Sequence, residues 1–570
     1  MSDMSDGATG RQLDPISTEV IRHSLDTIVD EMHASIRRTA YSVVVKDSLD
    51  FSSALLDANG RLLATAIGIP TLLGSMGPAL RSCLAKWGTE VFPGDVLLTN
   101  HPYMDNAHTN DVTVFVPVFD EVQELIGFAG AVCHHADVGG RVPGSASATN
   151  QSIFEEGVLY PAVKLEERGQ PSRSVYDIMW ANVRHPWQNR GDLRAQLAAT
   201  RVGERRLQRL VTRYGSEFFA ATGNALIEYT LRRTRQAIEA MPDGVYTADG
   251  AIDDDGLTMG VPVPIRVTVV IAGDRMSVDF TGTARQIAGG MNCPIATTRS
   301  VVQYGLKCLI GDDIPFNEGA VIPVDIIAPE GTLVNPRFPA AVGDRHHTSM
   351  IMANVLAEAL SEILPERGSA GWFCGVPATI VDATSNKTGE SSVFLSLLGG
   401  GAGASLKADG ADAVDAHMSN CALPPAEVIE STYPLRVERC ALVEDSGGAG
   451  RMRGGLGMRV DFRNVSESAL AFRVEVLQSS AATAARGLDG GCSGAPSSVW
   501  RIRDGVQLQM APKSSFDVAA GEIVSVRGGG GGGMGSPAQR LPAAVAGDVA
   551  SGRVSREAAE LLYGRTGDQN

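Results

Sequence analysis

The apolar run from Leu125 to Cys133 is the feature that most narrows the possible folds, because it predicts a buried strand. The run leads into His134-His135-Ala136-Asp137 and then into the glycine pair Gly139-Gly140. Such a set is typical of a site where side chains hold an ion or a proton and where the backbone comes close. Strand ends are common places for the chemistry of α/β proteins. The sequence therefore predicts a functional site at the end of this strand.

A second group of the same kind lies upstream, in Asn100-His101-Pro102-Tyr103 and His108-Thr109-Asn110-Asp111. Mixed histidine and carboxylate ligands suit a borderline divalent ion such as Zn²⁺ or Mn²⁺. One histidine or aspartate at a strand end is usually structural, but the His-x-x-Asp spacing occurs twice, in His108/Asp111 and in His134/Asp137. The repetition favours a metal or catalytic site.

Asp50 is a further candidate carboxylate. It leads into a predicted strand, Phe51 to Asp57, and the turn Ala58-Asn59-Gly60 after that strand predicts a hairpin. Asp50 would either join the histidines and aspartates at the site or cap the start of its own strand. The residues alone leave both roles open.

Length and composition limit the classes of protein to which this chain can belong. With 570 residues and 44% hydrophobic residues, the chain is long enough for three or four domains or for one large α/β body. No apolar stretch approaches the length of a transmembrane helix, and the polar N-terminus lacks a signal core, so we expect a cytoplasmic protein. The net charge of −16 argues against nucleic acid and anionic membranes as partners. The eight scattered cysteines predict reduced thiols.

The pattern along the chain predicts a mixed α/β (α+β) fold with several lobes. We expect a disordered tail at 1–13, an N-terminal α/β region with the metal site at 14–241, a central α/β region at 242–371 and a β-rich, glycine-rich C-terminal region at 372–570. The predicted helices span 17–40, 75–90, 192–240 with a break near Gly215, 297–309, 348–363 and 555–563. The predicted central strands span 263–271, 275–280 and 321–327.

Three glycine runs stand out, at 399–403, 447–457 and 528–533. None is followed by the Lys-Ser/Thr of a phosphate-binding P-loop, and none matches the dinucleotide fingerprint between a strand and a helix. Tight turns with close backbone packing are the favoured interpretation. The alternative is a set of backbone amides that holds a carbonyl or phosphate group of a ligand.

Two charged motifs remain open. Asp344-Arg345-His346-His347 opens a predicted helix, where it would either bind an anion or make an interdomain contact. Glu427 and Glu430 could form a carboxylate pair, although two acids three residues apart are more often a solvated helix face. No Gly-x-Ser-x-Gly elbow is present, which leaves a serine hydrolase with little support.

The order of these motifs resembles the hydantoinase B/oxoprolinase family from about residue 14 to 564. That family includes the B subunits of N-methylhydantoinase-type enzymes, the C-terminal half of 5-oxoprolinase, and subunits of caprolactamase and of acetone and acetophenone carboxylases. The matching motifs include Asp50-Phe51-Ser52, Gly74-Ser75-Met76, Asn100-His101-Pro102-Tyr103, Asp111-Val112-Thr113, His134-His135-Ala136-Asp137, Ile153-Phe154-Glu155-Glu156-Gly157, Asn317-Glu318-Gly319 and Arg453-Gly454-Gly455-Leu456-Gly457.

The resemblance implies a metal-containing B-type subunit of an ATP-dependent cyclic-amide hydrolase. Its partner would be an A-type ATPase subunit that binds ATP and Mg²⁺ and phosphorylates the carbonyl oxygen of a lactam or hydantoin, in a hetero-oligomer. The metal in this chain would hold and deprotonate water. The metal ligands would be Asp50, His108, Asp111, His134 and Asp137, and the catalytic residues His134, His135 and Asp137. His135 would be either a ligand or a proton carrier.

The resemblance leaves the reaction and the substrate open. The rival enzyme is a ketone carboxylase subunit with the same metal set, and a third class is a scaffold that holds no stoichiometric metal. Many members of the family have a histidine near 69–74, where this chain has Thr71 and Leu72, so a substrate contact is in doubt. The choice between Zn²⁺ and Mn²⁺ and the subunit stoichiometry stay open as well.

Overall fold

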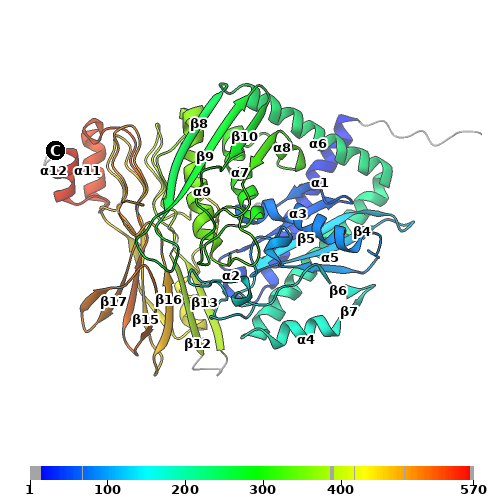
Figure 1. The fold of residues 1–570 in the computed structure, drawn as a ribbon, viewed down its shortest axis with the longest axis horizontal. Coiled ribbons are helices and arrows are strands. Elements are labelled where there is room, and N and C mark those ends of the chain that lie inside the picture. Colours follow the sequence, from blue (N-terminus) through cyan, green and yellow to red (C-terminus); the bar gives the residue numbers. More distant parts are fainter. Residues whose placement is uncertain are drawn as a thin grey trace, which may run out of the picture.

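The predicted buried strand is β5, the third strand of a seven-stranded antiparallel sheet (Figure 1). In the computed structural model the described residues are 14–564 without 67, 376, 385–390, 416 and 481, so the expected tail at 1–13 lies outside them. The order in this first sheet is β2-β1-β5-β4-β3-β6-β7. Its strands are β1 Phe51–Asp57, β2 Leu62–Thr65, β3 Val96–Thr99, β4 Asp111–Phe119, β5 Leu125–His134, β6 Val163–Glu167 and β7 Gln170–Pro171.

Helices cover both faces of this sheet. Val114 of β4 faces a core formed with α1 (Pro15–Thr39) and α5 (Pro186–Tyr214), whereas the adjacent Phe115 faces α3 (Pro70–Trp87). This alternation follows from the two-residue repeat of a strand and explains why β4 and β5 are apolar at nearly every position. Smaller helices here are α2 Val43–Lys46, α4 Arg173–Ala181, η1 Pro102–Met104 and η2 Ile153–Glu155.

A second sheet, of order β11-β10-β9-β8, follows the helix α6 (Ser216–Glu239). The predicted break near Gly215 is confirmed, because α5 ends and α6 begins on either side of this residue. The sheet packs against α7 (Ile295–Ile310) and α9 (Arg345–Ile363). Its strands are β8 Gly244–Ile252, β9 Val263–Ala272, β10 Arg275–Asp279 and β11 Val324–Ile327, with α8 Glu318–Val321 and η3 Pro365–Arg367 beside them.

The C-terminal region contains two sheets that pack face to face. Val381 and Phe472 of one sheet share an apolar core with Phe462 and Val524 of the other. The first has the order β13-β12-β16-β19, with β12 Ala378–Thr384, β13 Ser391–Leu397, β16 Leu470–Glu475 and β19 Lys513–Val518. The second has the order β14-β15-β20-β17-β18, with β14 Leu435–Leu442, β15 Met458–Asn464, β17 Ser498–Arg503, β18 Val506–Gln509 and β20 Ile523–Arg527. The remaining helices are α10 Ala426–Thr432, η4 Pro537–Gln539, α11 Pro542–Ala550 and α12 Arg556–Tyr563.

The glycine runs form hydrogen-bonded segments that pack against one another; the run at 447–457 bends at Gly447 and Gly450, and the run at 528–533 has neither bend nor turn. The close-packing part of that prediction is confirmed. None of the glycines at 528–533 has a positive φ. Gly531 donates its N–H to the carbonyl of Gly455 at 3.0 Å and accepts from Gly448 at 2.8 Å. At almost every position a methyl group would overlap a neighbouring carbonyl, which is why side chains are absent there. The amides that make these bonds are not available to a ligand.

Within the described residues, no helix has the length and apolar character that a membrane crossing requires.

Candidate metal centre

The ends of three neighbouring strands, β1, β5 and β4, lie side by side in the first sheet and bring most of the predicted site residues together. Asp111 begins β4 and His134 ends β5, and the two are directly paired across these antiparallel strands. Asp50 precedes β1, whose first residue pairs with Cys133, and the His134 N–H donates to the Asp50 carbonyl at 3.1 Å. His108 lies in the loop that enters β4. The antiparallel order β1-β5-β4 thus places the start of two strands beside the end of a third.

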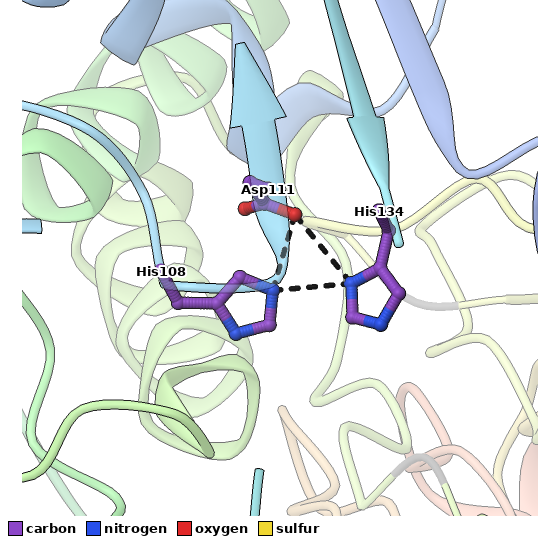
Figure 2. A group of neighbouring side chains, drawn as sticks. All are labelled: His108, Asp111 and His134. Atoms are coloured by element: carbon purple, nitrogen blue, oxygen red, sulfur yellow. Dashed lines mark hydrogen bonds and ion pairs between the residues drawn. The ribbon is translucent and has the colours of Figure 1, made fainter. Parts of the chain in front are cut away.

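His108, Asp111 and His134 point their ligand atoms at one another (Figure 2). His108 Nε2 lies 3.1 Å from both Asp111 Oδ1 and His134 Nδ1, and His134 Nδ1 lies 3.5 Å from Asp111 Oδ1. Ligands held at about 2.1 Å from one ion lie about 3.0 Å apart in octahedral and about 3.4 Å apart in tetrahedral geometry. The observed spacings therefore fit a shared divalent cation.

The hydrogen bond on the far side of His108 also suits a metal ligand. His108 Nδ1 lies 2.8 Å from the carbonyl oxygen of Gly343, which can only accept a proton. The neutral ring therefore carries its proton on Nδ1 and directs the lone pair of Nε2 at Asp111 and His134. Burial lowers the pKa of His108 to about 4, and the Arg345 guanidinium acts in the same direction. Near neutral pH His108 is therefore an uncharged ring whose Nε2 offers an electron pair to a metal ion.

The carboxylates of the site are held in different states. Arg345 donates to Asp111 Oδ2 at 2.6 Å; although burial acts against it, His108 and Arg345 hold the pKa of Asp111 well below its usual range. Burial raises the pKa of the Asp50 carboxyl, whose Oδ2 lies 3.8 Å from His134 Nδ1. Burial acts to lower the pKa of His134, but Asp111 and Asp50 raise it. Asp111 is thus a fixed anion, whereas burial favours the protonated form of Asp50.

Three predicted site residues lie outside this cluster: Asp50, whose Oδ2 comes no nearer than 3.8 Å to His134 Nδ1, Asp137 and His135. Asp137 Oδ1 accepts the backbone N–H of Gly139 at 2.9 Å, and its Oδ2 accepts from Gly144 N at 3.1 Å and from Arg184 Nη1 at 2.8 Å. The carboxylate therefore ties the loop after β5 to Arg184. His135 is buried with its Nε2 3.0 Å from Gln196 Oε1 on α5, away from the three ligand atoms.

Residues of the central region complete the site, and the sequence patterns did not assign them to it. Gly343 and Arg345 hold His108 and Asp111, so the motif 344–347 contributes a contact between regions rather than an anion site at Arg345. Glu156 supports the same loop, because its Oε1 accepts the N–H groups of Val342 at 2.8 Å and Gly343 at 2.7 Å. No spacing rule could have linked Asp111 to a residue 234 positions away.

We predict that Glu156 makes stability depend on pH. Burial raises its pKa to about 8 in the folded chain, against an ordinary value of 4.5. Between these pH values the folded state keeps a proton that the unfolded state has lost, so stability falls as pH rises and levels off above about 8. Glu156→Gln should remove this fall, which is on the order of a few kcal/mol.

The test is the melting temperature from pH 5 to pH 9. Glu155→Gln makes the same chemical change one residue away, at a side chain that is 32% exposed and pairs with Arg141. Because Glu155 makes only the smallest contribution to the raised pKa of Glu156, this variant should keep most of the wild-type fall in stability. A Glu156→Gln profile that falls as steeply as the wild type would show that Glu156 is ionised in the folded chain.

A cavity of about 80 Å³ opens beside the cluster. Asp50, His108 and His134 line it together with side chains of β12 and β13. The cluster therefore borders an internal cavity.

Comparisons with known proteins agree over nearly the whole chain. The model of the hydantoinase B/oxoprolinase family matches residues 14–537. The B subunit of a putative D-/L-hydantoinase from Pseudomonas sp. (strain NS671) is 33% identical, covering 98% of this chain and 96% of the relative. The ATP-dependent caprolactamase structure from Pseudomonas jessenii superposes with a TM-score of 0.91 at 29% identity, covering 97% and 96% of the two chains. Acetone carboxylase shares the fold, with a TM-score of 0.90 at 21% identity, covering 98% and 80%.

Proposed function

This chain belongs to the hydantoinase B/oxoprolinase family, and we propose that it is the metal-carrying B-type subunit of an ATP-dependent enzyme that hydrolyses cyclic amides. The observation that carries the proposal is the cluster of His108, Asp111 and His134, with three ligand atoms within 3.5 Å of one another beside a cavity. The similarity to a hydantoinase subunit and to caprolactamase supports hydrolysis of a ring amide.

Each residue of the site has a separate role in this proposal. A divalent ion held by His108, Asp111 and His134 would supply a water acidic enough to lose a proton near neutral pH. Gly343 keeps the His108 proton on Nδ1, and Arg345 keeps Asp111 ionised. Asp50 Oδ2 is the base that accepts the proton, because it lies beside His134 and its pKa is raised by burial. Asp137 and His135 position the loop and the strand end that carry His134.

A partner subunit would carry out the ATP-dependent activation of the ring amide. This chain contains no G-x-x-x-x-G-K-[ST] loop, so we assign ATP and Mg²⁺ to an A-type subunit that phosphorylates the carbonyl oxygen of the ring amide. A first water, deprotonated by Asp50, would then attack the same carbon, and the C–N bond of the ring would break as the nitrogen takes up a proton. A second water would attack this carbon of the resulting acyl phosphate, and the phosphorylated oxygen would leave as inorganic phosphate. The active enzyme would therefore be a hetero-oligomer.

Oxygen labelling tests this reaction. With the A-type partner, ATP, a responsive lactam or hydantoin and ¹⁸O water, we expect two solvent oxygens in the new carboxylate and the original carbonyl oxygen in inorganic phosphate, because the ring carbon gives up its only oxygen. Either chain alone should give no ring-opened product. A product that carries carbon from labelled bicarbonate, or a carboxylate without solvent oxygen, would replace the hydrolase with the carboxylase alternative.

A further inference from the structure

The start of α9 carries a second group of side chains that could hold a metal ion. Asp344, His346 and His347 offer ligand atoms that all lie within 4.8 Å of one another. His346 Nδ1 lies 3.7 Å from Asp344 Oδ1, and His347 Nε2 lies 3.9 Å from Asp344 Oδ2. These separations are too long for hydrogen bonds. Ligands about 2.1 Å from one ion lie about 3.4 Å apart in tetrahedral geometry, so a closure of roughly half an ångström would bring these atoms onto one cation.

Two polar atoms that face each other in this group have no hydrogen-bond partner among the described residues. They are Asp344 Oδ2 and His347 Nε2. Asp344 is 3% exposed and His347 is 0% exposed, so bulk water does not reach them. Asp344 also occupies the N-cap position of α9, yet within the described residues its side chain makes no capping hydrogen bond. Buried polar atoms normally have a partner, which points to an ion or a water between these two.

Both histidines are uncharged and therefore able to bind a metal ion. Burial lowers the pKa of His346 to about 3, and burial also holds the pKa of His347 well below its usual range. A neutral imidazole keeps a lone pair on one ring nitrogen. Two imidazoles and one carboxylate form a ligand set that suits Zn²⁺ and related divalent ions.

The charges around the group leave Asp344 without a compensating cation. Arg345, Arg473 and Lys513 place positive charge near the group. Each of them lies beside a different carboxylate, namely Asp111 at 2.6 Å, Glu475 at 3.5 Å and Asp254 at 3.0 Å. In the described part of the chain no arginine or lysine forms an ion pair with Asp344. Burial, followed by the neighbouring Glu475 carboxyl, raises the pKa of Asp344 well above its usual range.

We propose that Asp344, His346 and His347 form a second divalent-metal site, of the kind that takes Zn²⁺. The inference goes beyond the proposed function and does not depend on ring opening. Gly343 and Arg345 belong to the same segment and hold two ligands of the first metal centre. An ion at the start of α9 would therefore fix the segment that orients those ligands.

Three features oppose a cation at this place and set its expected affinity. The amide N–H groups in the first turn of α9 carry partial positive charge. Arg345 Nε and Arg473 Nε are buried and have no hydrogen-bond partner in the ranges that the structure describes. Asp344 must release its proton before it can bind a metal ion. We therefore expect the second ion to bind more weakly than the first and to be lost during purification, so that only added metal reveals it.

Titration of the full chain with Zn²⁺ tests the second site in a His134→Ala background, which removes a ligand of the first site. After removal of metal with a chelator, this variant should bind one Zn²⁺ per chain in equilibrium dialysis. Its melting temperature should rise with the Zn²⁺ concentration, because an ion that binds the folded chain stabilises it. Adding His347→Gln should weaken Zn²⁺ binding by at least about tenfold and remove most of this rise.

His417→Gln in the same background is the matched control. His417 is also a buried histidine, but its Nδ1 lies 3.0 Å from the Tyr304 hydroxyl, so the control should bind Zn²⁺ as the background does. No Zn²⁺ on the background variant, at concentrations well above that of the chain, would overturn the inference. Equal binding with and without His347→Gln would also overturn it and assign the ion to other histidines. If His347→Gln does not fold, His346→Gln makes the same test at a side chain that is 20% exposed. Ring opening enters none of these measurements, so a failure of the proposed function leaves them readable.

Discussion

His134→Ala will lose its bound divalent ion and its ring-opening activity while the chain remains folded. His134 contributes one of the three converging ligand atoms, and its Nδ1 lies within 3.5 Å of both His108 Nε2 and Asp111 Oδ1. Loss of even a supporting group at a metal site often lowers affinity by roughly 10–100-fold, and loss of a direct ligand should cost on the order of a hundredfold or more. Elemental analysis, turnover with the A-type partner and the melting temperature measure the three outcomes.

His135→Gln is the matched control for metal content. This buried neighbour faces Gln196 rather than the cluster, and the amide of the new glutamine can still donate to Gln196, so the variant should retain its metal. Stoichiometric metal in His134→Ala, or equal metal loss in both variants, would contradict the assignment of His134 as a ligand.

Gly531→Ala will prevent stable folding of the C-terminal region. A methyl group on Gly531 would overlap the backbone of Ala402, and the two hydrogen bonds of Gly531 hold it between Gly455 and Gly448. Backbone atoms on all sides cannot move aside as the end of a side chain can. We expect a loss of more than about 4 kcal/mol, the range reserved for severe packing defects, or an insoluble chain.

Gly547→Ala provides the control for the same chemical change. This glycine lies in α11 with no heavy atom within 4 Å of an added methyl group. Alanine favours a helix over glycine by about 1 kcal/mol, so the variant should be as stable as the wild type or slightly more stable. Soluble yield and the denaturation midpoint compare the two variants, and a Gly531→Ala chain as stable as Gly547→Ala would show that the packed glycine layer tolerates side chains.

The strongest local patterns predicted their elements well. The apolar run ending in Cys133 forms β5, and the long charged stretch forms α5 and α6 with the break at Gly215. The sequence patterns did not predict short or atypical elements correctly. The four-residue helix α2 consists mostly of valines, which favour strands, and α3 begins at Pro70 rather than at residue 75. Neither the antiparallel order of the first sheet nor its partners could be derived from local periodicity.

The glycine runs and the candidate metal centre also show that local patterns do not reveal contacts between residues far apart in the sequence. A run of glycines is compatible with a turn or with extended packing, and distant carbonyls such as those of Gly371 and Ala495 select the second. Chemistry and spacing predicted His108, Asp111 and His134 as site residues, and the structure brings their ligand atoms together. The same spacing paired His134 with Asp137, but the Asp137 carboxylate contacts Arg184, because the chain leaves the strand after His134.

The bond between His108 and Gly343 also constrains when the site can mature during synthesis. Gly343 follows His134 by 209 positions, and Arg345 follows two residues later. At typical rates of translation this separation corresponds to roughly ten to forty seconds. A nascent chain that ends between these points has all three ligands, but nothing orients the His108 ring or neutralises Asp111. We therefore expect the ribosome-bound N-terminal half to hold metal weakly and to acquire it firmly only after α9 has emerged and docked.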